Sequence, residues 1–213
     1  MRKPSTIHYK LHEVTPYINW LYFFHAWGFP ARFAAVAQIH GCDSCRAGWL
    51  ASFPAEERAK AAEAMQLHKE AVRMLNRLDV EYQVHVRFGL FDCNSDGEDL
   101  VIEESSLSFL RQQEPPFLCL TDFIRPVNDE GLRDKIGVFA ACADEGIEHL
   151  YEEGSAEADA YKHLLCQTLA DRLAEAAVER AHEAIRKFYW GYAPDEQLTI
   201  ADYEHLTRYL EER

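Results

Sequence analysis

Two carboxylates, an imidazole and a guanidinium recur in one stretch of the chain at intervals that suit a helix. They belong to Asp171, Glu175, His182 and Arg186, which fall within roughly 60° of one another at 3.6 residues per turn. A carboxylate pair on a rigid helix can bind a cationic amino group or hydrogen-bond a histidine. The same pattern suits a solvated helix face with internal ion pairs, such as one between Glu175 and a residue a turn away. The spacing alone leaves both interpretations open.

A second cluster holds a histidine and two cysteines within six residues. The stretch His40-Gly41-Cys42-Asp43-Ser44-Cys45 has the Cys-x-x-Cys spacing that suits zinc or thiol redox chemistry. A closed zinc site needs four ligands, however, and no second cysteine pair lies nearby in the sequence. A metal or redox protein is therefore an alternative hypothesis, and the favoured interpretation assigns no metal ligand.

Length and composition narrow the class of protein. The chain has 213 residues, of which 48% are hydrophobic and 27% charged, which suits one or at most two globular domains. Its formal charge of −14 argues against a nucleic-acid partner, because phosphate binding needs a basic face. The apolar stretches are too short for a membrane span, and the first residues do not resemble a signal peptide. We therefore expect a cytoplasmic protein whose six cysteines are reduced thiols.

The expected helices lie at both ends of the chain. The first dozen residues are polar and irregular, and a dense aromatic cluster at Tyr17 to Phe24 indicates a buried anchor or a binding wall. Helical spacing predicts a helix over Pro54 to Leu78 and a long helix over about Ala156 to Phe188. A last short helix is expected from about Thr199, which resembles the start of a capping box. The apolar side of the long helix is formed by Leu165, Leu169, Leu173, Ala176, Ala177 and Phe188.

The expected strands lie between these helices. Alternation of apolar and polar residues predicts a strand from Val84 to Leu90, and a turn at Cys93 to Glu98 leads into a second strand at Leu100 to Ile102. Phe117 to Ile124 and Lys135 to Cys142 are predicted as two more strands. The order of helices, then strands, then helices favours an α+β fold with a mainly antiparallel sheet.

Three stretches in and after the long helix carry a family resemblance. Leu169–Ala176 reads LADRLAEA, His182-Glu183 follows, and Arg186–Pro194 reads RKFYWGYAP. Together they resemble the signature of the activation domain of cobalamin-dependent methionine synthase. The similarity covers about Tyr17 to Glu196, and several segments in one order are far more specific than one short motif. The other matching segments are Tyr17-Ile18-Asn19-Trp20 with Phe23-Phe24, Gly89-Leu90-Phe91, Leu110–Gln113, Cys119–Phe123 and Ile136–Ala140.

The resemblance implies a fold and an activity. The family's domain is C-shaped, with a mainly antiparallel sheet flanked by helices. It belongs to an enzyme that passes a methyl group from methyltetrahydrofolate to homocysteine through cobalamin. When the cobalamin has been oxidised, the domain binds S-adenosylmethionine and docks on the cobalamin module, and flavodoxin or a related flavoprotein donates an electron. The chain is therefore expected to be part of this methyltransferase, inactive alone and without a catalytic residue, since the cofactors carry the chemistry.

The resemblance also implies roles for five residues. Glu175 and Asn19 would hold the amino-acid portion of S-adenosylmethionine, with Asn19 standing where the family has an aspartate and so lacking that charge. Asp171 would receive the histidine of the cobalamin module after this histidine leaves cobalt. Trp190 and Tyr192 would shape the binding groove, and core aromatics that close the helix end are an equal alternative.

One family motif is missing from the sequence. The family carries an Arg-x-x-x-Gly-Tyr motif that contributes to the S-adenosylmethionine site, and none follows Tyr192. We therefore expect residues 1–213 to form a single activation-type domain without the C-terminal part of the family's domain. A truncated piece, a partner chain that supplies the rest and a loss of tight binding all explain this. A docking module that binds no S-adenosylmethionine is thus an alternative function, beside the Cys-x-x-Cys metal or redox protein.

Overall fold

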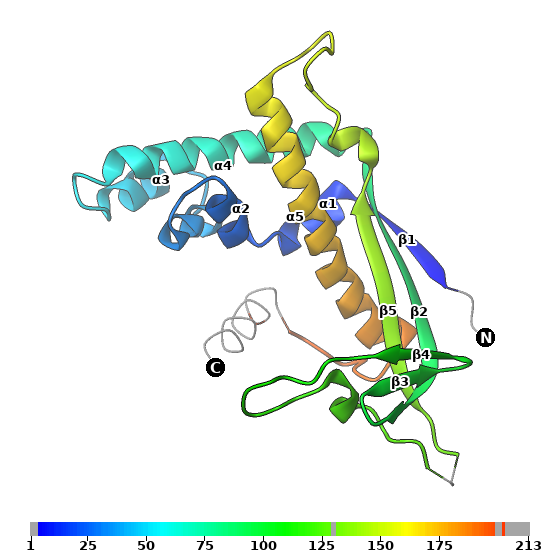
Figure 1. Cartoon of the computed structure of the whole chain (residues 1–213). Helices are drawn as coiled ribbons and strands as arrows, with labels where there is room; N and C mark the ends of the chain where they lie inside the picture. The colour runs from blue at the N-terminus through cyan, green and yellow to red at the C-terminus, as the bar shows by residue number, and fades with distance from the viewer. Residues whose placement is uncertain (1–3, 129–130, 199–201, 203–213) are drawn as a thin grey trace. The chain divides into compact units, whose positions relative to one another are not determined.

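Helical segments, a group of strands and a long helix follow one another along the chain (Figure 1). The structure is a computed structural model that describes residues 4–128, 131–198 and 202. The chain divides into two compact units, one of Met1–Ile7 with Arg87–Ala140 and the other of His8–Val86 with Ala141–Arg213. The candidate residues on the long helix all belong to the second unit.

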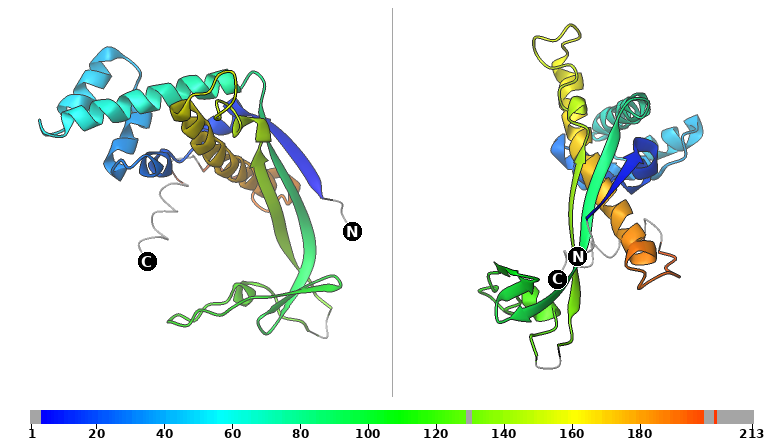
Figure 2. Two further views of the ribbon diagram at one scale, coloured as in Figure 1. Left: turned by 45° about the horizontal axis from the view of Figure 1, so that its top comes forward. Right: turned by 90° about the vertical axis from the view of Figure 1, so that its right-hand side faces the viewer.

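Within the described residues, five strands form one sheet. They occur in the order β1-β2-β3-β4, and β5 pairs with β2. The β2–β3 and β3–β4 pairs are antiparallel, and β2 and β5 lie side by side in both views of Figure 2. The expected α+β fold with an antiparallel sheet is confirmed. The strands are β1 (Ser5–Lys10), β2 (Gln83–Asp96), β3 (Asp99–Ile102), β4 (Ser105–Ser108) and β5 (Asp134–Ala143).

The β2–β3 hairpin is tighter than the turn predicted at Cys93 to Glu98. Strand β2 continues through Cys93 to Asp96, which pairs with Asp99. Gly97 lies between them with φ +62°, a left-handed conformation that glycine adopts without a steric penalty. The strands expected from Val84, from Leu100 and from Lys135 are present as parts of β2, β3 and β5.

The strand predicted over Phe117 to Ile124 is wrong. This segment contains the 3₁₀ helix η3 (Leu120–Phe123) instead. The Asp122 carboxylate accepts a hydrogen bond from the Cys119 backbone N–H at 2.9 Å and binds the Arg111 guanidinium through two contacts of 2.7 and 2.8 Å. A short polar side chain that binds nearby backbone in this way favours a turn over a strand.

The expectation that the first dozen residues are irregular is also wrong. Ser5–Lys10 forms β1 and Leu11–Val14 forms the short helix α1. In β1, only Tyr9 is buried and half of the residues are exposed. The strand is therefore held by its pairing with β2 more than by burial of apolar side chains. The elements that follow are η1 (Thr15–Tyr17), α2 (Trp20–Ala26), η2 (Ala31–Gln38) and α3 (Asp43–Ala51).

The core of the second unit lies around two long helices, α4 (Arg58–Leu78) and α5 (Ala160–Ala184), which cross in Figure 1. Helix α2 also packs against α5, and α1 packs against both long helices. The aromatic cluster contributes Phe23 and Phe24 as fully buried anchors. The short helix η4 (Glu145–Ile147) precedes α5 and buries Ile147.

The end of the long helix departs from the regular geometry on which the sequence analysis relied. A π-helix, η5 (Ile185–Tyr189), continues α5. Its wider turn shifts the following side chains around the axis relative to an α-helix. Among the described helices and strands, none apart from α5 packs closely on η5. Phe188, which was expected on the apolar side, is therefore 73% exposed, and that expectation is wrong.

Among the described residues, no helix combines the length and the apolar character that crossing a membrane requires. The helix expected from Thr199 lies outside the described residues, apart from Asp202.

Candidate functional site

The polar face of helix α5 is exposed because the helix is capped at Asp159 and buries its apolar side. The Asp159 side chain caps it by accepting a hydrogen bond from the Lys162 N–H at 3.1 Å, which satisfies a backbone donor without an intrahelical partner. Asp171 and Glu175 are exposed one turn apart. The opposite side is buried, as expected, at Leu165, Leu169, Leu173, Ala176 and Ala177.

The Glu175 carboxylate forms an ion pair within its own helix. Its Oε2 atom lies 2.6 Å from Nη1 of Arg172, three residues earlier. The Glu175 side chain is 58% exposed, whereas that of Arg172 is only 16% exposed. The guanidinium carbon of Arg172 also lies 5.9 Å from the centre of the Tyr22 ring on α2, within cation–π distance. A carboxylate and a guanidinium therefore stand side by side at the surface, beside an aromatic ring.

Asp171 differs from Glu175 in its surroundings. Its carboxylate makes no hydrogen bond or ion pair with any residue that the structure describes. It lies one turn before Glu175, so both carboxylates face the same side of α5. Asp171 thus offers an acceptor to a group from outside the chain.

His182 and Arg186 lie near the C-terminal end of α5, beyond Asp171 and Glu175. Burial lowers the pKa of His182, so its imidazole favours the neutral form. The Arg186 guanidinium donates to both oxygens of Glu196 at 2.6 and 2.9 Å. This bidentate pair fastens the segment after η5 back onto the helix.

Asn19 begins helix α2. Its Oδ1 atom accepts a hydrogen bond from the Leu21 N–H at 3.0 Å, which makes Asn19 the N-cap. An aspartate at this position would cap the helix equally well, so the cap does not depend on the charge that asparagine lacks. Tyr22, which meets Arg172, lies one turn further along α2, so Asn19 and Glu175 belong to two helices that pack against each other.

Trp190 and Tyr192 stand together beyond the π-helix. Their ring centres are 5.2 Å apart and perpendicular, an edge-to-face arrangement. Gly191 between them has φ +76°, which turns the chain after the Trp190 N–H has donated to the Ile185 carbonyl at 2.8 Å. Tyr192 is 61% exposed, so its ring is accessible from solvent.

Arg172 and Tyr22 were not among the residues predicted for the site. The Arg172 position was visible, since it lies three residues before Glu175, where oppositely charged side chains on a helix meet. Tyr22 belonged to the aromatic cluster, but its contact with Arg172 depends on how α2 packs on α5. The spacing of apolar residues within each helix does not predict this packing.

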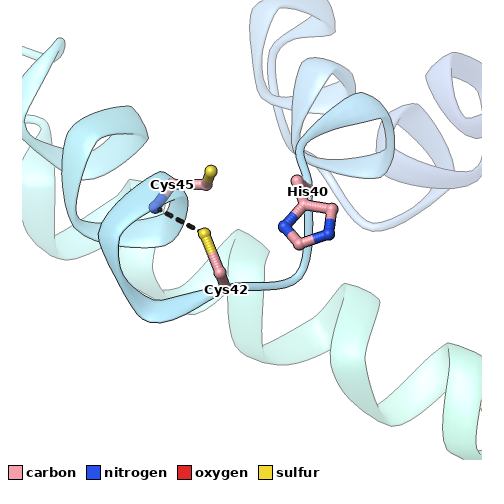
Figure 3. A group of neighbouring side chains, drawn as sticks. All are labelled: His40, Cys42 and Cys45. Atoms are coloured by element: carbon pink, nitrogen blue, oxygen red, sulfur yellow. Dashed lines mark hydrogen bonds between the residues drawn. The ribbon is translucent and has the colours of Figure 1, made fainter.

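The cysteine cluster is also brought together, on a different part of the second unit. His40 lies just before α3, Cys42 is its N-cap and Cys45 lies in its first turn (Figure 3). Cys42 Sγ accepts a hydrogen bond from the Cys45 N–H at 3.3 Å and lies 3.3 Å from Ser44 Oγ. Hydrogen bonds from the Cys45 thiol, Ser44 and His40 lower the pKa of Cys42 to about 6.

Comparison with known proteins places this fold in a family. A family model described as "Vitamin B12 dependent methionine synthase, activation domain" matches residues 10–209. The match spans nearly the whole sequence, and the chain therefore belongs to this family. The resemblance noted in the sequence is confirmed.

The chain also resembles a solved structure. The chain is similar to the one described as "Crystal Structure of the MetH Reactivation Domain bound to AdoHcy", with 28% sequence identity and a TM-score of 0.77. The similarity covers 96% of this chain and 62% of that chain. The present chain therefore corresponds to less than two thirds of the length of the protein that it matches.

Proposed function

We propose that this chain binds S-adenosylmethionine over the Asp171–Glu175 face of α5 and docks on the cobalamin module of a methionine synthase to help reactivate oxidised cobalamin. The observation that carries the proposal is the pairing of Glu175 with Arg172 at the surface. An amino acid carries an ammonium and a carboxylate on one carbon. An adjacent carboxylate and guanidinium complement both groups.

The other proposed contacts follow from the same geometry. Tyr22 supplies an aromatic ring beside Arg172, and Asn19 retains amide hydrogens while its oxygen caps α2. Trp190 and Tyr192 offer an exposed aromatic edge. The similar MetH reactivation domain is described as bound to AdoHcy, which shares the amino-acid portion of S-adenosylmethionine. This likeness supports the choice of ligand.

Asp171 has a different proposed role. Its carboxylate is exposed and makes no hydrogen bond or ion pair with the other described residues of α5's polar face, so it can accept a hydrogen bond from a histidine of the cobalamin module. A carboxylate stabilises both the imidazole and the imidazolium form of such a histidine. The bound cobalamin and S-adenosylmethionine supply the methyl and electron chemistry, while this chain orients them. A flavodoxin-like donor, a cytoplasmic location and a single activation-type domain over residues 1–213 belong to the same proposal.

Calorimetric titration of the whole chain with S-adenosylmethionine and AdoHcy tests the ligand site. We expect binding of both, and a loss of at least about tenfold in affinity on Glu175→Gln, because a charge-assisted hydrogen bond contributes about 1.5–3 kcal/mol. Glu179→Gln is the matched control, since Glu179 is an exposed glutamate one turn further along α5. Equal affinities for the two variants would remove Glu175 from the site.

A second experiment tests the docking role. With the cobalamin module added, Asp171→Asn should disfavour the state in which the module's histidine has left cobalt. The visible spectrum of the oxidised cobalamin reports this ligation. An unchanged spectrum, together with unchanged affinity for S-adenosylmethionine, would exclude the role proposed for Asp171.

The same ion pair has a second interpretation, in which the chain is a docking module that binds no S-adenosylmethionine. The Glu175 carboxylate already has the Arg172 guanidinium as its partner at 2.6 Å, and a ligand ammonium has to share it. The two functions differ in a simple result. Docking on the cobalamin module without any heat of S-adenosylmethionine binding would support the docking module.

A further inference from the structure

Three side chains that commonly bind metals come together away from the α5 face. The ligand atoms of His40, Cys42 and Cys45 all lie within 4.8 Å of one another. Figure 3 shows the two sulfur atoms on the same side of the first turn of α3, with the His40 ring turned toward Cys42. Two thiols and an imidazole are the ligand types that zinc prefers.

The local fold explains why these atoms converge. Cys42 has extended backbone angles at the N-cap, and its sulfur takes the place of a capping oxygen by accepting from the Cys45 N–H. The Arg46 N–H then donates to the Cys42 carbonyl at 3.1 Å and continues the helix. The two intervening residues bring the Cys45 side chain back over Cys42. His40 approaches from the preceding turn, so one short segment supplies all three groups.

We propose that His40, Cys42 and Cys45 form a binding site for a zinc-class divalent cation, with the fourth coordination position left to water or to a ligand from outside the chain. Tetrahedral zinc with Zn–S bonds of about 2.3 Å keeps neighbouring ligand sulfurs about 3.8 Å apart. Because the three ligand atoms lie within 4.8 Å of one another, they need to approach by at most about 1 Å. His40 and Cys45 are exposed and Cys42 is half-buried, so small side-chain rotations close the site without moving the core.

The ligand set also balances the charge of the ion. Two thiolates neutralise a divalent cation, and the neutral imidazole adds no charge. Within the part of the chain that the structure describes, no other group of three histidine, cysteine or acidic side chains comes together in this way. Three protein ligands with an open fourth position is the arrangement of zinc sites that exchange a water or a ligand. The site is separate from the proposed S-adenosylmethionine contacts on α5.

A disulfide between Cys42 and Cys45 is the competing use of the same pair. It uses only two of the three convergent side chains, and its formation removes two electrons, which requires an oxidant that neither the structure nor the proposed function supplies. The convergence of three ligands instead of two therefore favours the metal.

Cobalt substitution tests the proposal on the whole reduced chain after treatment with a chelator. Titration with Co²⁺ should produce a near-ultraviolet thiolate-to-cobalt band and intense visible bands of a tetrahedral ion, saturating at one equivalent, and Zn²⁺ should abolish these bands. A change outside the ligand shell weakens metal binding by about 10–100-fold. Larger losses of affinity are expected for each of the ligand variants, which are Cys42→Ser, Cys45→Ser and His40→Gln.

Matched controls are available on the same chain. Cys142→Ser removes another exposed cysteine and His25→Gln another exposed histidine, and both should retain one equivalent with unchanged affinity. Because all three ligands lie near the surface, circular dichroism should report a native fold for every variant. Absence of the thiolate band in the reduced chain, or equal loss in the control variants, would overturn the proposal. A Cys42–Cys45 disulfide in the purified chain whose reduction yields no metal binding would overturn it as well.

Discussion

Glu175 and Arg172 form a 2.6 Å ion pair across one turn of α5, and the two partners differ in burial. The Arg172 side chain is only 16% exposed and contacts the ring of Tyr22 on α2, while the Glu175 carboxylate faces solvent. The guanidinium is thereby held in place by the packing of two helices. The carboxylate is held mainly by the guanidinium, so a ligand can compete for it at low cost in stability.

The first prediction follows from that asymmetry. Glu175→Gln should change the free energy of unfolding by no more than about 0.5 kcal/mol, since pairs of this kind on a helix surface contribute about 0.3–0.5 kcal/mol. Arg172→Gln should cost about 1 kcal/mol, because it also removes the contact with Tyr22. Urea unfolding of both single variants and the double variant measures the coupling between them. A coupling of several kcal/mol would show that the pair is a structural element and not an open ligand site.

The sequence predicted the parts of the fold that repeat. The long helices and the β2–β3 hairpin were visible because apolar residues recur in them with a period of 3.6 or 2. Strand β1 was missed because it has few buried side chains and depends on its pairing with β2. The segment that forms η3 resembles a strand in the sequence because its apolar residues are more apparent than the capping role of the Asp122 carboxylate.

For the candidate site, the sequence predicts which side chains of α5 are exposed or buried but not which helix packs beside it. The exposure of Asp171 and Glu175 and the burial of Leu169 and Leu173 follow from helical periodicity. The prediction failed at Phe188, because periodicity does not show where the elements that pack on the helix end. Periodicity also carries no information on which helix packs beside α5, so the contact between Arg172 and Tyr22 needed the structure.

The Arg186–Glu196 pair yields a second prediction. The Glu196 side chain is only 8% exposed, and both of its oxygens accept from Arg186. Breaking a fully buried ion pair costs about 3–5 kcal/mol. Because this pair is partly exposed, Glu196→Gln should lower the free energy of unfolding by about 2 kcal/mol. Hydrogen exchange should become faster over residues 185–196. Asp195→Asn removes an exposed neighbouring carboxylate and should leave both measurements unchanged.

His68 on α4 yields a prediction about pH. Its ring lies 4.4 Å from that of Trp20 and 6.5 Å from that of Phe24, and burial lowers its pKa from 6.5 to about 4. In the unfolded chain, the imidazole therefore binds a proton at a higher pH than in the folded chain. The stability due to neutral His68 is present above pH 6.5 and is lost as the pH falls toward 4.

The measurement compares His68→Phe, which keeps an aromatic ring in this position, with the unaltered chain. Between pH 7 and about pH 5, the unaltered chain should lose about 2 kcal/mol more than the variant, at about 1.36 kcal/mol per pH unit below 6.5. Urea midpoints at several pH values give this difference. Parallel curves for the two proteins would contradict the burial of a neutral imidazole at this site.

Two glycines should respond in opposite ways to the same substitution. Gly191 has φ +76°, and a side chain in this region costs about 1–2 kcal/mol. A Cβ there meets nothing closer than the Phe188 carbonyl at 3.9 Å, so the cost of Gly191→Ala is backbone strain alone. Gly48 lies inside α3 and a Cβ there meets nothing within 4 Å. Gly48→Ala should therefore stabilise the protein by about 0.5–1 kcal/mol.

The comparison of these two variants separates global stability from the shape of the proposed groove. Because Gly191 sets the turn between Trp190 and Tyr192, Gly191→Ala should weaken S-adenosylmethionine binding as well as stability, while Gly48→Ala should raise the urea midpoint and leave the affinity unchanged. If Gly191→Ala lowers the midpoint and keeps full affinity, the Trp190–Tyr192 pair does not line the ligand site. The two aromatic rings then close the end of α5, which is the alternative that their sequence left open.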